Sequence, residues 1–520
     1  MQFEGTPKLS ENYDVVVIGG ALSGASTATL LLRKNPGIRI LIIEKTEKLT
    51  RRVGEATVEV SGYFLGRVLG LTQYLNEHHI SKQGLRFWFA NERVKSLDQA
   101  AEIGPRYLAR LPSYQLDRAE LDEEVLRRAA ESGAEVLRLA TVCNIELVAG
   151  GLQKLEVKHQ DQRLQITARW IVDASGLSAL LCRKHGWWRA NTEHPTAAAW
   201  TRWKGVKDWD GRELAEKFPD WSAAQYGTRG TATNHIIGDG WWSWWIPLKG
   251  GDVSVGVVWD KRLVDFPRDG RGIGTRLKDF LSKHPVANEM LERAEFVEDD
   301  MHWRKNLAYR STTFAGDGFV LVGDAAAFLD PFYSPGMDWI GFSASCAADL
   351  ITRQRSGSEL ALEKYNRDFS VCYQRWFEAL YKDKYDYIGE FDLLDLAFRL
   401  DLSLYYWGVV QPIYQNGEMA YLAPPFSPPS GKFFAALMRT YNRRFATIAR
   451  RRRKLGQLGK MNDNRRKLIP GFTLDRNDTR RIFSMLGQWL KLELKEGWRT
   501  WGEGSEVTEV QTASHEVPMV

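Results

Sequence analysis

The sequence predicts an α/β fold in which a parallel sheet covered by helices is joined to a sheet-rich insertion and a helical C-terminal region. Three observations support this fold class. A buried-strand pattern with a glycine-rich turn opens the chain, strand-like aromatic runs follow in the middle, and apolar residues repeat at intervals of three and four near the end. We therefore expect a discontinuous first domain at residues 10–190 and 305–360, a sheet domain at 191–304, a helical region at 361–503 and a mobile tail at 504–520.

Composition places the chain among ordinary globular proteins. It has 520 residues, of which 44% are hydrophobic and 26% are charged. This length exceeds the size at which a single core stops growing, so two or more cores are expected. No stretch approaches the roughly 20 apolar residues of a membrane span, and the N-terminus lacks the pattern of a signal peptide. We therefore expect no transmembrane segment and a cytoplasmic location.

Charge and cysteine usage narrow the functional classes. The net charge is +6, and much of the excess lies in residues 449–467. We interpret this segment as a solvated helical face, with nucleic-acid binding as the less favoured alternative. The cysteines show no disulfide or metal-ligand spacing, so we expect buried thiols and no metal site. They are Cys143, Cys182, Cys346 and Cys372.

The first strong pattern is a βαβ unit of the Rossmann type. An apolar run at residues 15–18 predicts a buried strand, small residues open a helix, and a second apolar run ends at Glu44. The turn permits close approach of a pyrophosphate to helix amides, and the acid accepts from a ribose hydroxyl. Ala21 stands where the second glycine of the fingerprint usually lies. The candidate dinucleotide contacts are Gly19, Ala21, Ser23, Gly24, Glu44 and Lys45.

Two later segments indicate that the dinucleotide is FAD. "WIVDASG" provides Asp173 and Gly176, and "GFVLVGDAAAF" provides Gly323 and Asp324. With these segments the chain resembles the FAD-dependent monooxygenase and halogenase superfamily. The resemblance implies that Asp324 contacts the ribityl region and that the next helix points its N-terminus at the isoalloxazine. A helix N-terminus stabilises negative charge on a reduced flavin. The helix start gives two more candidate contacts, Gly336 and Met337.

The segment "GWWSWWIPL" crowds four tryptophans beside a proline. A core strand is the plainer explanation of such a run. The stretch from 242 to 247 also fits WxWxIP, a signature that is similar to that of flavin-dependent halogenases, in which it lies near the flavin. The resemblance implies that apolar bulk here keeps substrate and water away from the flavin. The motif residues are Trp242, Trp244, Ile246 and Pro247.

Two further segments resemble halogenases. "VGEATVEVSGYFL" looks like the family's Gly-Glu-Ala-Thr segment and adds Glu55 and Ala56 as cofactor contacts. Lys82 precedes an alternating strand at residues 85–89, where the resemblance implies a catalytic lysine that holds hypohalous acid or carries it as a haloamine. A protonated amine donates hydrogen bonds, a neutral amine is nucleophilic, and burial lowers its pKa. A solvated surface lysine is the alternative.

The loop "DPFYSPGMD", residues 330–338, departs from the tryptophan halogenase pattern. Tyr333 stands in place of a glutamate that assists the lysine, and Pro335 stands in place of a threonine whose neighbourhood binds chloride. Proline has no N–H, so one potential halide donor is absent. We keep Tyr333 as a candidate catalytic residue and assign anion binding to Gly336 and its neighbours.

The leading hypothesis is an FAD-dependent halogenase that receives reduced FAD from a separate flavin reductase and uses O2 with chloride or bromide to halogenate an electron-rich aromatic substrate. The main alternative is a non-halogenating FAD-dependent monooxygenase or an isoprenoid or lipid reductase on the same scaffold, which Pro335 favours. In that case residues 402–415 border an apolar entrance instead of filling a helical core. A third hypothesis is a flavin-binding protein without turnover that docks a partner through residues 450–454.

Overall fold

The N-terminal pattern folds into the centre of a parallel sheet. Strand β1 (Asn12–Ile18) leads through the glycine turn into helix α1 (Leu22–Lys34), and β2 (Ile40–Ile43) pairs with β1 in parallel. Continuous apolar runs suit strands that are covered on both faces, and all four residues of β2 are buried. The computed structural model describes residues 12–224, 229–359, 361–471 and 476–501, so the tail predicted at 504–520 lies outside the described residues.

The first sheet has eight strands and combines distant parts of the chain. Its main order is β19-β20-β10-β1-β2-β7, with β8 and β9 continuing from β10 as antiparallel strands. Strand β20 pairs in parallel with β10, so the chain returns to this sheet after the insertion. The bounds are β7 (Glu135–Leu137), β8 (Ala140–Glu146), β9 (Gln153–His159), β10 (Gln162–Asp173), β19 (Ala315–Gly316) and β20 (Phe319–Leu321).

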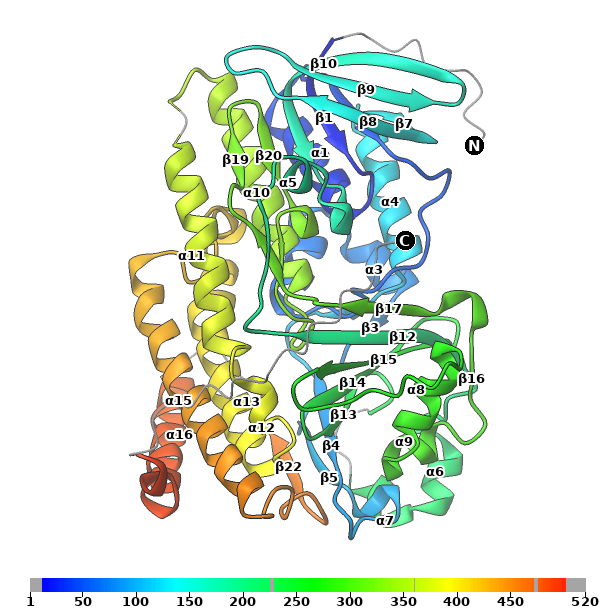
Figure 1. The fold of residues 1–520 in the computed structure, drawn as a ribbon, viewed down its shortest axis with the longest axis vertical. Helices are drawn as coiled ribbons and strands as arrows, with labels where there is room; N and C mark the ends of the chain where they lie inside the picture. The colour runs from blue at the N-terminus through cyan, green and yellow to red at the C-terminus, as the bar shows by residue number, and fades with distance from the viewer. Residues whose placement is uncertain (1–11, 225–228, 360, 472–475, 502–520) are drawn as a thin grey trace.

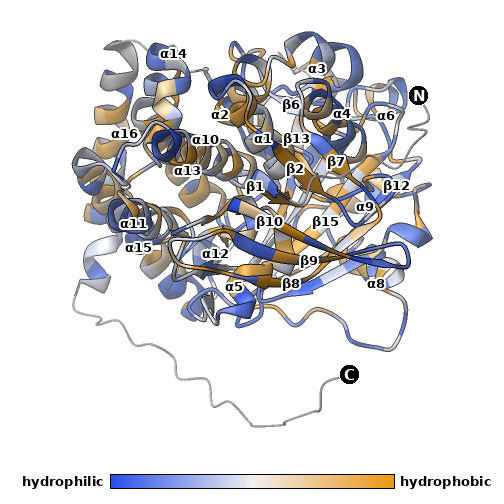
Figure 2. Ribbon diagram, turned by 90° about the horizontal axis from the view of Figure 1, so that it is seen from above, coloured by the Kyte–Doolittle hydropathy of each residue, from blue (hydrophilic) through white to orange (hydrophobic). Residues whose placement is uncertain are grey.

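Helices cover this sheet and its apolar core. Helix α1 packs against α4 (Arg118–Glu131) and α10 (Gly336–Arg355). Figure 2 shows the hydrophobic residues gathered on the central strands, including β1 and β2. The shorter elements around this domain are α2 (Glu59–Tyr63), α3 (Thr72–His78), β3 (Ile80–Ser81), β6 (Tyr114–Gln115), α5 (Leu180–Lys184), β11 (Trp188–Ala190), β18 (Tyr309–Ser311) and β21 (Ala327–Phe328).

The second sheet has nine strands in the order β16-β12-β15-β14-β13-β4-β5-β22, with β17 paired to β12 (Figure 1). Four short helices accompany it: α6 (Arg212–Lys217), α7 (Pro219–Ala223), α8 (Ile273–Leu281) and α9 (Pro285–Met290). Its strands are β4 (Leu85–Phe89), β5 (Ala101–Pro105), β12 (Thr196–Lys204), β13 (Thr233–Gly238), β14 (Trp241–Pro247), β15 (Val253–Asp260), β16 (Glu295–Phe296), β17 (His302–Lys305) and β22 (Arg466–Ile469).

The second sheet extends beyond the range 191–304 that the sequence predicted for it. Strands β4 and β5 precede that range, and β22 comes from the region expected to be helical. The reason is tertiary pairing: β4 runs parallel to β13, with Phe87 opposite His235, and β22 runs parallel to β5. Local sequence periodicity identifies a strand but not the sheet that it joins.

Beyond residue 361 the chain is mainly helical, and its helices lie along one side of both sheets (Figure 1). Apolar residues of these helices share one core with both sheets. The segment 402–415 contributes to the core, as the first explanation expected, because Leu404 and Val410 are buried. Leu402 also lines a cavity, and an apolar entrance at this segment stays untested. The bounds are α11 (Leu362–Leu380), α12 (Lys384–Tyr387), α13 (Phe391–Tyr405), a π-turn (Tyr406–Val410), α14 (Gln411–Asn416), α15 (Pro429–Lys454) and α16 (Arg476–Lys495).

The basic segment is not the freely solvated face that we expected. Arg452 at the end of α15 is 12% exposed and binds Glu390 at 2.6 Å and Glu496 at 2.7 Å. Arg450 binds Asp386 at 2.7 Å. The carboxylates come from segments distant in sequence, so the excess charge of this helix end is engaged in holding the helices together.

Two absences apply to the described residues alone. No helix among them is long and apolar enough to cross a membrane. They also contain no cluster of three or more His, Cys, Asp or Glu side chains that could hold a metal ion. Cys182, Cys346 and Cys372 are buried as expected, but Cys143 is exposed because it lies on the outer part of strand β8.

Candidate cofactor and substrate site

The glycine turn after β1 has the geometry of a phosphate cradle. Gly19 has a φ of +104°, and a Cβ there would lie 2.5 Å from the carbonyl oxygen of Ala174. A Cβ on Gly24 would lie 1.9 Å from the carbonyl oxygen of Gly19, so both glycines are required by close backbone approach. Ala21, the N-cap of α1, makes no side-chain capping bond. The first amides of α1 therefore face the turn with a polarity that suits the FAD pyrophosphate.

The acid after β2 stabilises the same turn. Glu44 is buried, and its carboxylate accepts the backbone N–H of Gly20 at 2.9 Å and that of Thr46 at 3.0 Å. Lys45 beside it is exposed. The Thr46 hydroxyl also donates to the same oxygen as the Thr46 N–H, at 2.9 Å, whereas the oxygen that accepts Gly20 retains a second acceptor position. Glu44 is therefore still able to receive a ribose hydroxyl.

Two further turns close around the start of α1. A Cβ on Gly323 would touch Ser23 at 3.0 Å, so the Gly-Asp turn directly contacts the first turn of α1. Asp324 is half-buried, and burial raises its pKa against the opposing effect of Arg304 and Arg118. A partly desolvated carboxylate at this position suits hydrogen bonding to the hydroxyl groups of a ribityl chain.

Asp173, at the end of β10, stabilises the turn that follows the strand. Its carboxylate accepts the N–H groups of Ser175 at 3.0 Å and Leu181 at 2.8 Å. It thereby fixes the turn that contains Gly176, where φ is +60°. The structure brings this turn to the cradle through the Ala174 carbonyl, and a direct contact of Asp173 or Gly176 with FAD stays a prediction.

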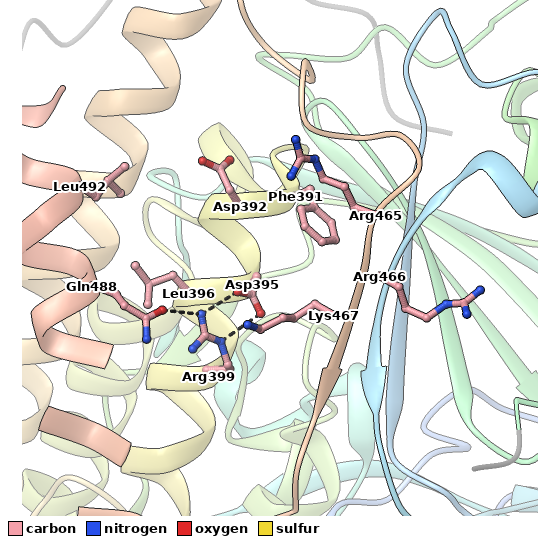
Figure 3. Close-up of a pocket in the computed structure, with 10 residues that line it drawn as sticks. All are labelled: Phe391, Asp392, Asp395, Leu396, Arg399, Arg465, Arg466, Lys467, Gln488 and Leu492. Carbon is pink, nitrogen blue, oxygen red and sulfur yellow. Dashed lines mark hydrogen bonds and ion pairs between the residues drawn. The ribbon is translucent and has the colours of Figure 1, made fainter. Parts of the chain in front are cut away.

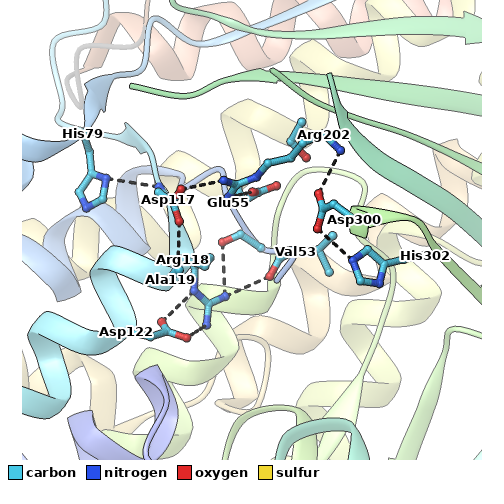
Figure 4. Close-up of polar contacts among 12 residues, drawn as sticks. Val53, Glu55, His79, Asp117, Arg118, Ala119, Asp122, Arg202, Asp300 and His302 are labelled. Carbon is cyan, nitrogen blue, oxygen red and sulfur yellow. Dashed lines mark hydrogen bonds and ion pairs between the residues drawn. The ribbon is translucent and has the colours of Figure 1, made fainter. Parts of the chain in front are cut away.

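Glu55 joins the two sheets. Arg202 of β12 donates to Glu55 at 2.9 Å and to Asp117 at 2.8 Å, as Figure 4 shows. Burial raises the pKa of Glu55 to about 7, although Arg202 opposes the shift. Ala56 beside it is buried and bridges to Gln115. Arg202 and Asp117 were not predicted, because a charged residue within a strand and an acid at a helix start have no motif to mark them.

A cavity of about 260 Å³ lies between the FAD-type domain, the second sheet and the C-terminal helices. Its wall includes Lys82 and Leu85 from the β3–β4 segment and Ile469 from the end of β22. Apolar and aromatic groups make up most of the wall, which is typical of a pocket for a small organic molecule. The polar residues on it are Thr57, Glu59, Lys82, Tyr107, Arg110, Ser113, Tyr333, Asp338, Tyr381, Asp401, Tyr405, Tyr406 and Arg481.

Lys82 is buried in this wall, with a side chain that does not reach bulk solvent. The residue is 2% exposed, and its ammonium donates to the carbonyl oxygen of Thr57 at 2.7 Å. Burial lowers the pKa of Lys82 to about 8, while the charges of Glu59 and Asp338 oppose the shift. The surface-lysine alternative is therefore wrong.

The loop before α10 is strained and held by a buried ion pair. Tyr333 and Ser334 both have left-handed φ values, +68° and +57°, which cost free energy in residues other than glycine. The Tyr333 hydroxyl donates to Asp401 at 3.3 Å, and Asp401 pairs with fully buried Lys384 at 2.7 Å. Burial raises the pKa of Tyr333 well above its ordinary value. The side chain is thus an anchored part of the cavity wall, and its catalytic role stays a prediction.

Pro335 is the N-cap of α10, and Gly336 and Met337 follow it as the first helical residues. Pro335 lines the cavity, and the carbonyl oxygen of Pro335 accepts the N–H of Trp339 at 2.9 Å. Pro335 has no N–H, so the unpaired amides at this point belong to the first turn of α10. Contact of Gly336 and Met337 with a halide or with FAD stays a prediction.

The tryptophan segment is a buried strand, and it also adjoins this loop. Side chains alternate along β14, so that Trp242, Trp244 and Ile246 enter the core shared with Phe332, whereas Trp245 enters the core beneath α8 and α9. The Trp242 ring lies 5.1 Å from that of Phe332. Pro247, half-buried, ends the strand opposite Val253. The motif tryptophans are therefore core residues of a strand, as the plainer explanation expected, and Trp242 among them also contacts the loop before α10.

Asp338 and Glu59 are site residues that the sequence reasoning missed. Asp338 lies in the first turn of α10, where a carboxylate has an ordinary role in helix stability and no motif marks it. Burial raises the pKa of Asp338 to about 7, and the negative charge of Glu59 adds to the effect. The Tyr406 hydroxyl donates to Glu59 at 2.5 Å.

A second hollow, of about 450 Å³, lies between α13, β22 and α16 (Figure 3). Its charged groups are largely paired: Arg399 binds Asp395 at 2.6 Å, and Arg452 binds Asp392 at 2.8 Å. Arg465 and Lys467 at its edge are exposed. The buried carboxylate of this hollow, Asp395, is neutralised by Arg399, so we do not take the hollow as the candidate catalytic site.

Comparisons with known proteins agree with this geometry. The sequence profile "Tryptophan halogenase" matches residues 14–96 and 97–382. The flavin-dependent halogenase chlA of Dictyostelium discoideum is 27% identical over 459 residues, which cover 80% of this chain and 72% of that protein. The tryptophan 2-halogenase of Chondromyces crocatus is 25% identical over 71% of this chain and 66% of that protein.

Solved structures share the fold at low sequence identity. Halogenase PltM in complex with phloroglucinol and FAD has a TM-score of 0.71 and 19% identity, covering 92% of this chain and 96% of that one. The flavin-dependent brominase Bmp2 has a TM-score of 0.63 and 22% identity, covering 83% and 99%. The profile match extends over more than half of the chain and includes the cradle, Lys82, the tryptophan strand and the strained loop. This chain therefore belongs to the tryptophan halogenase family of flavin-dependent enzymes.

Proposed function

We propose that this protein is an FAD-dependent halogenase that uses reduced FAD, O2 and chloride or bromide to halogenate a small electron-rich aromatic compound. One observation carries the proposal: the Lys82 ammonium is buried in the wall of an aromatic-lined cavity beside the first turn of α10. A desolvated amine has little structural value unless it is paired, so its single carbonyl partner points to a chemical role.

The residues of the cradle fit FAD, with the α1 amides and Glu44 toward the adenosine diphosphate, Asp324 toward the ribityl chain and the first turn of α10 toward the ring system. Bound in its reduced form, this cofactor supplies the oxidation of halide by O2. The described residues show one dinucleotide cradle, at the β1–α1 turn, so we assign the supply of reduced FAD to a separate reductase.

Lys82 presents the oxidised halogen to the substrate. A protonated amine has three N–H donors, of which the Thr57 carbonyl takes one, and two remain for hypohalous acid. The cavity excludes bulk water from the ammonium, so its hydrogen bonds are stronger there than in solution. The walls around it hold an aromatic ring through Leu85, Trp376 and Phe398.

The volume of about 260 Å³ suits a small ring compound more than a long chain. The halogenase PltM, which shares the fold, has been captured with phloroglucinol. A small phenol or similar aromatic is therefore the substrate class that we propose here, ahead of an isoprenoid or lipid.

A second candidate function is favoured by Pro335. Since proline removes one amide donor from the helix start, a non-halogenating FAD-dependent monooxygenase would keep the same cradle and cavity without binding halide. This alternative predicts oxygenated product that forms at the same rate with and without halide.

The test mixes FAD-loaded protein with photoreduced FAD, O2 and bromide, and measures bromination of a phenol panel. We expect bromophenol from the wild type and none from Lys82→Ala. The matched control is Lys207→Ala, which removes another buried lysine whose ammonium binds Glu289 at 2.7 Å. Flavin oxidation without bromination of any phenol would refute the halogenase, and oxygenated phenol would favour the second candidate.

A further inference from the structure

Asp338 places a buried carboxylate in the cavity wall beside Lys82. One carboxylate oxygen accepts the N–H of Ser61 at 3.0 Å, and the other accepts the Tyr405 hydroxyl at 3.3 Å. Each oxygen retains a further acceptor position. Asp338 is 1% exposed and lines the cavity. A substrate bound in the cavity therefore reaches its free acceptor positions, whereas bulk water does not.

The other two carboxylates on the cavity wall, Asp401 and Glu59, have shorter hydrogen bonds or ion pairs than Asp338 has. Asp401 receives Lys384 at 2.7 Å and Tyr441 at 2.7 Å, so its charge is neutralised within the protein. Glu59 receives Tyr406 at 2.5 Å and is half-buried at the cavity edge. Among the described carboxylates that line the cavity, Asp338 alone is both fully buried and without an ion pair to a cation within 4 Å.

We propose that Asp338 is a catalytic base that accepts the hydroxyl proton of a phenolic substrate, and that the enzyme therefore selects phenols over aromatic rings that lack an ionisable hydroxyl. This inference rests on the proposed halogenase function and deepens it. Tyr333 does not fill this role, because its hydroxyl is a donor committed to Asp401.

The reaction step is balanced with the groups in the cavity. The phenol passes its hydroxyl proton to Asp338, and the ring carbon forms a carbon–halogen bond as the halogen–oxygen bond of hypohalous acid breaks. The ring supplies the electron pair, and the departing hydroxide takes a proton from the Lys82 ammonium to form water. The ring C–H proton then moves to the Lys82 amine, and Asp338 returns its proton to the phenolate oxygen. Phenol and hypohalous acid thus give halophenol and water.

The groups facing Asp338 set the pH dependence. The charged groups are Glu59 of α2 and Lys82 of the β3–β4 segment, and the titratable tyrosines are Tyr381, Tyr405 and Tyr421. Asp338 acts as its carboxylate, so the rate rises as the pH passes through its pKa of about 7. Lys82 acts as its ammonium, so the rate falls as the pH passes through its pKa of about 8. The pH optimum for phenol halogenation therefore lies between these values.

The test compares the FAD-loaded wild type with Asp338→Asn on a phenol and on its O-methyl ether. For the phenol we expect a loss of about 10²-fold or more and disappearance of the acidic limb. For the ether, which has no hydroxyl proton, we expect a loss at least tenfold smaller. Asp395→Asn is the control: it removes a buried carboxylate of α13 that lines the other hollow, and it keeps the acidic limb in place.

Two neighbouring variants keep the proposal testable if Asp338→Asn folds poorly. Tyr405→Phe removes a donor to the carboxylate, so the acidic limb moves to higher pH. Glu59→Gln removes a like charge, so the acidic limb moves to lower pH, and the basic limb of Lys82 follows it downward. If Asp338 had only a structural role, the acidic limb of the pH profile would not move in opposite directions in Tyr405→Phe and Glu59→Gln.

A trapping assay separates the two possible failures. Taurine converts free hypohalous acid into a haloamine without a phenol. No haloamine from the wild type would refute the halogenase function itself. Haloamine from the wild type, together with equal phenol and ether losses in Asp338→Asn, would overturn the base assignment alone.

Discussion

The indole N–H of Trp242 donates a hydrogen bond to the Tyr385 hydroxyl across 2.9 Å, and this contact ties the tryptophan strand to α12. The Tyr385 hydroxyl donates in turn to Asp330 at 2.9 Å, and His194 contacts the same carboxylate oxygen at 2.7 Å. Asp330 begins the strained loop, and its other oxygen accepts the N–H of Phe332 at 2.9 Å. The motif tryptophan therefore positions the loop by hydrogen bonding as well as by bulk.

We predict that Trp242→Phe lowers the free energy of unfolding by about 1–3 kcal/mol, because the Tyr385 hydroxyl loses a buried donor. The loop shifts with it, so halogenation slows. Urea unfolding and product formation measure the two effects. Trp245→Phe is the control, since its indole donates to Ser243 at 2.9 Å on the opposite face of β14. Equal slowing in both variants would refute the coupling.

Pro335→Thr is expected to strengthen halide binding. Threonine accepts the φ of −74° and ψ of −11° found here and adds a backbone N–H beside the first turn of α10. A hydrogen bond to a charged group is worth about 1.5–3 kcal/mol, so the KM for bromide should fall by about tenfold or more. Pro331→Thr in the same loop is the control. An unchanged KM in Pro335→Thr would show that this amide position does not face the halide.

Lys384→Met should destabilise the protein by about 3–5 kcal/mol, because it leaves the Asp401 carboxylate buried without its cation. The Tyr333 anchor weakens at the same time. Thermal and urea unfolding test this expectation. Lys207→Met should cost much less, since its partners Glu213 and Glu292 are about half exposed and are able to return to water. Its third partner, Glu289, is 12% exposed but keeps an ion pair with Lys217 at 2.8 Å. Similar losses in both variants would contradict the role given to burial.

Gly24→Ala is expected to weaken FAD binding. The new Cβ would lie 1.9 Å from the Gly19 carbonyl oxygen, so α1 must move away from the turn at a cost of about 1–3 kcal/mol. Fluorescence titration gives the Kd for FAD. In Gly487→Ala the Cβ meets nothing within 4 Å, and this helical substitution should leave the Kd unchanged while stabilising α16 by about 0.5–1 kcal/mol. An unaltered Kd in Gly24→Ala would refute the cradle.

The parts of the fold that were predictable are those encoded locally. The βαβ unit and the tryptophan strand were predicted because a glycine turn and a period of two are visible within a few residues. The position of Lys82 followed from its neighbours, but its burial did not, because the β3–β4 segment alone does not reveal the helices that cover it. The resemblance implied that Lys82 carries the halogen, and the structure shows that Lys82 is buried in the cavity wall.

The remainder depends on contacts between distant segments. The sequence around Arg452 predicted a solvated side chain, but in the fold it forms ion pairs with Glu390 and Glu496. Asp338 sits in an unremarked helix turn, and only the packing of Ser61 and Tyr405 around it creates a desolvated carboxylate. Likewise, Arg202 acquires its bridging function from two partners that lie more than 80 positions away in the sequence.

Strand β22 closes the cavity from a distant part of the chain. Residues 466–469 complete the edge of a sheet whose other strands lie before residue 306, and Ile469 and Arg481 then form part of the cavity wall. This side of the wall therefore depends on the pairing between β22 and β5. Loosening of that pairing would admit water to the substrate cavity while leaving the glycine cradle and Lys82 in their own elements.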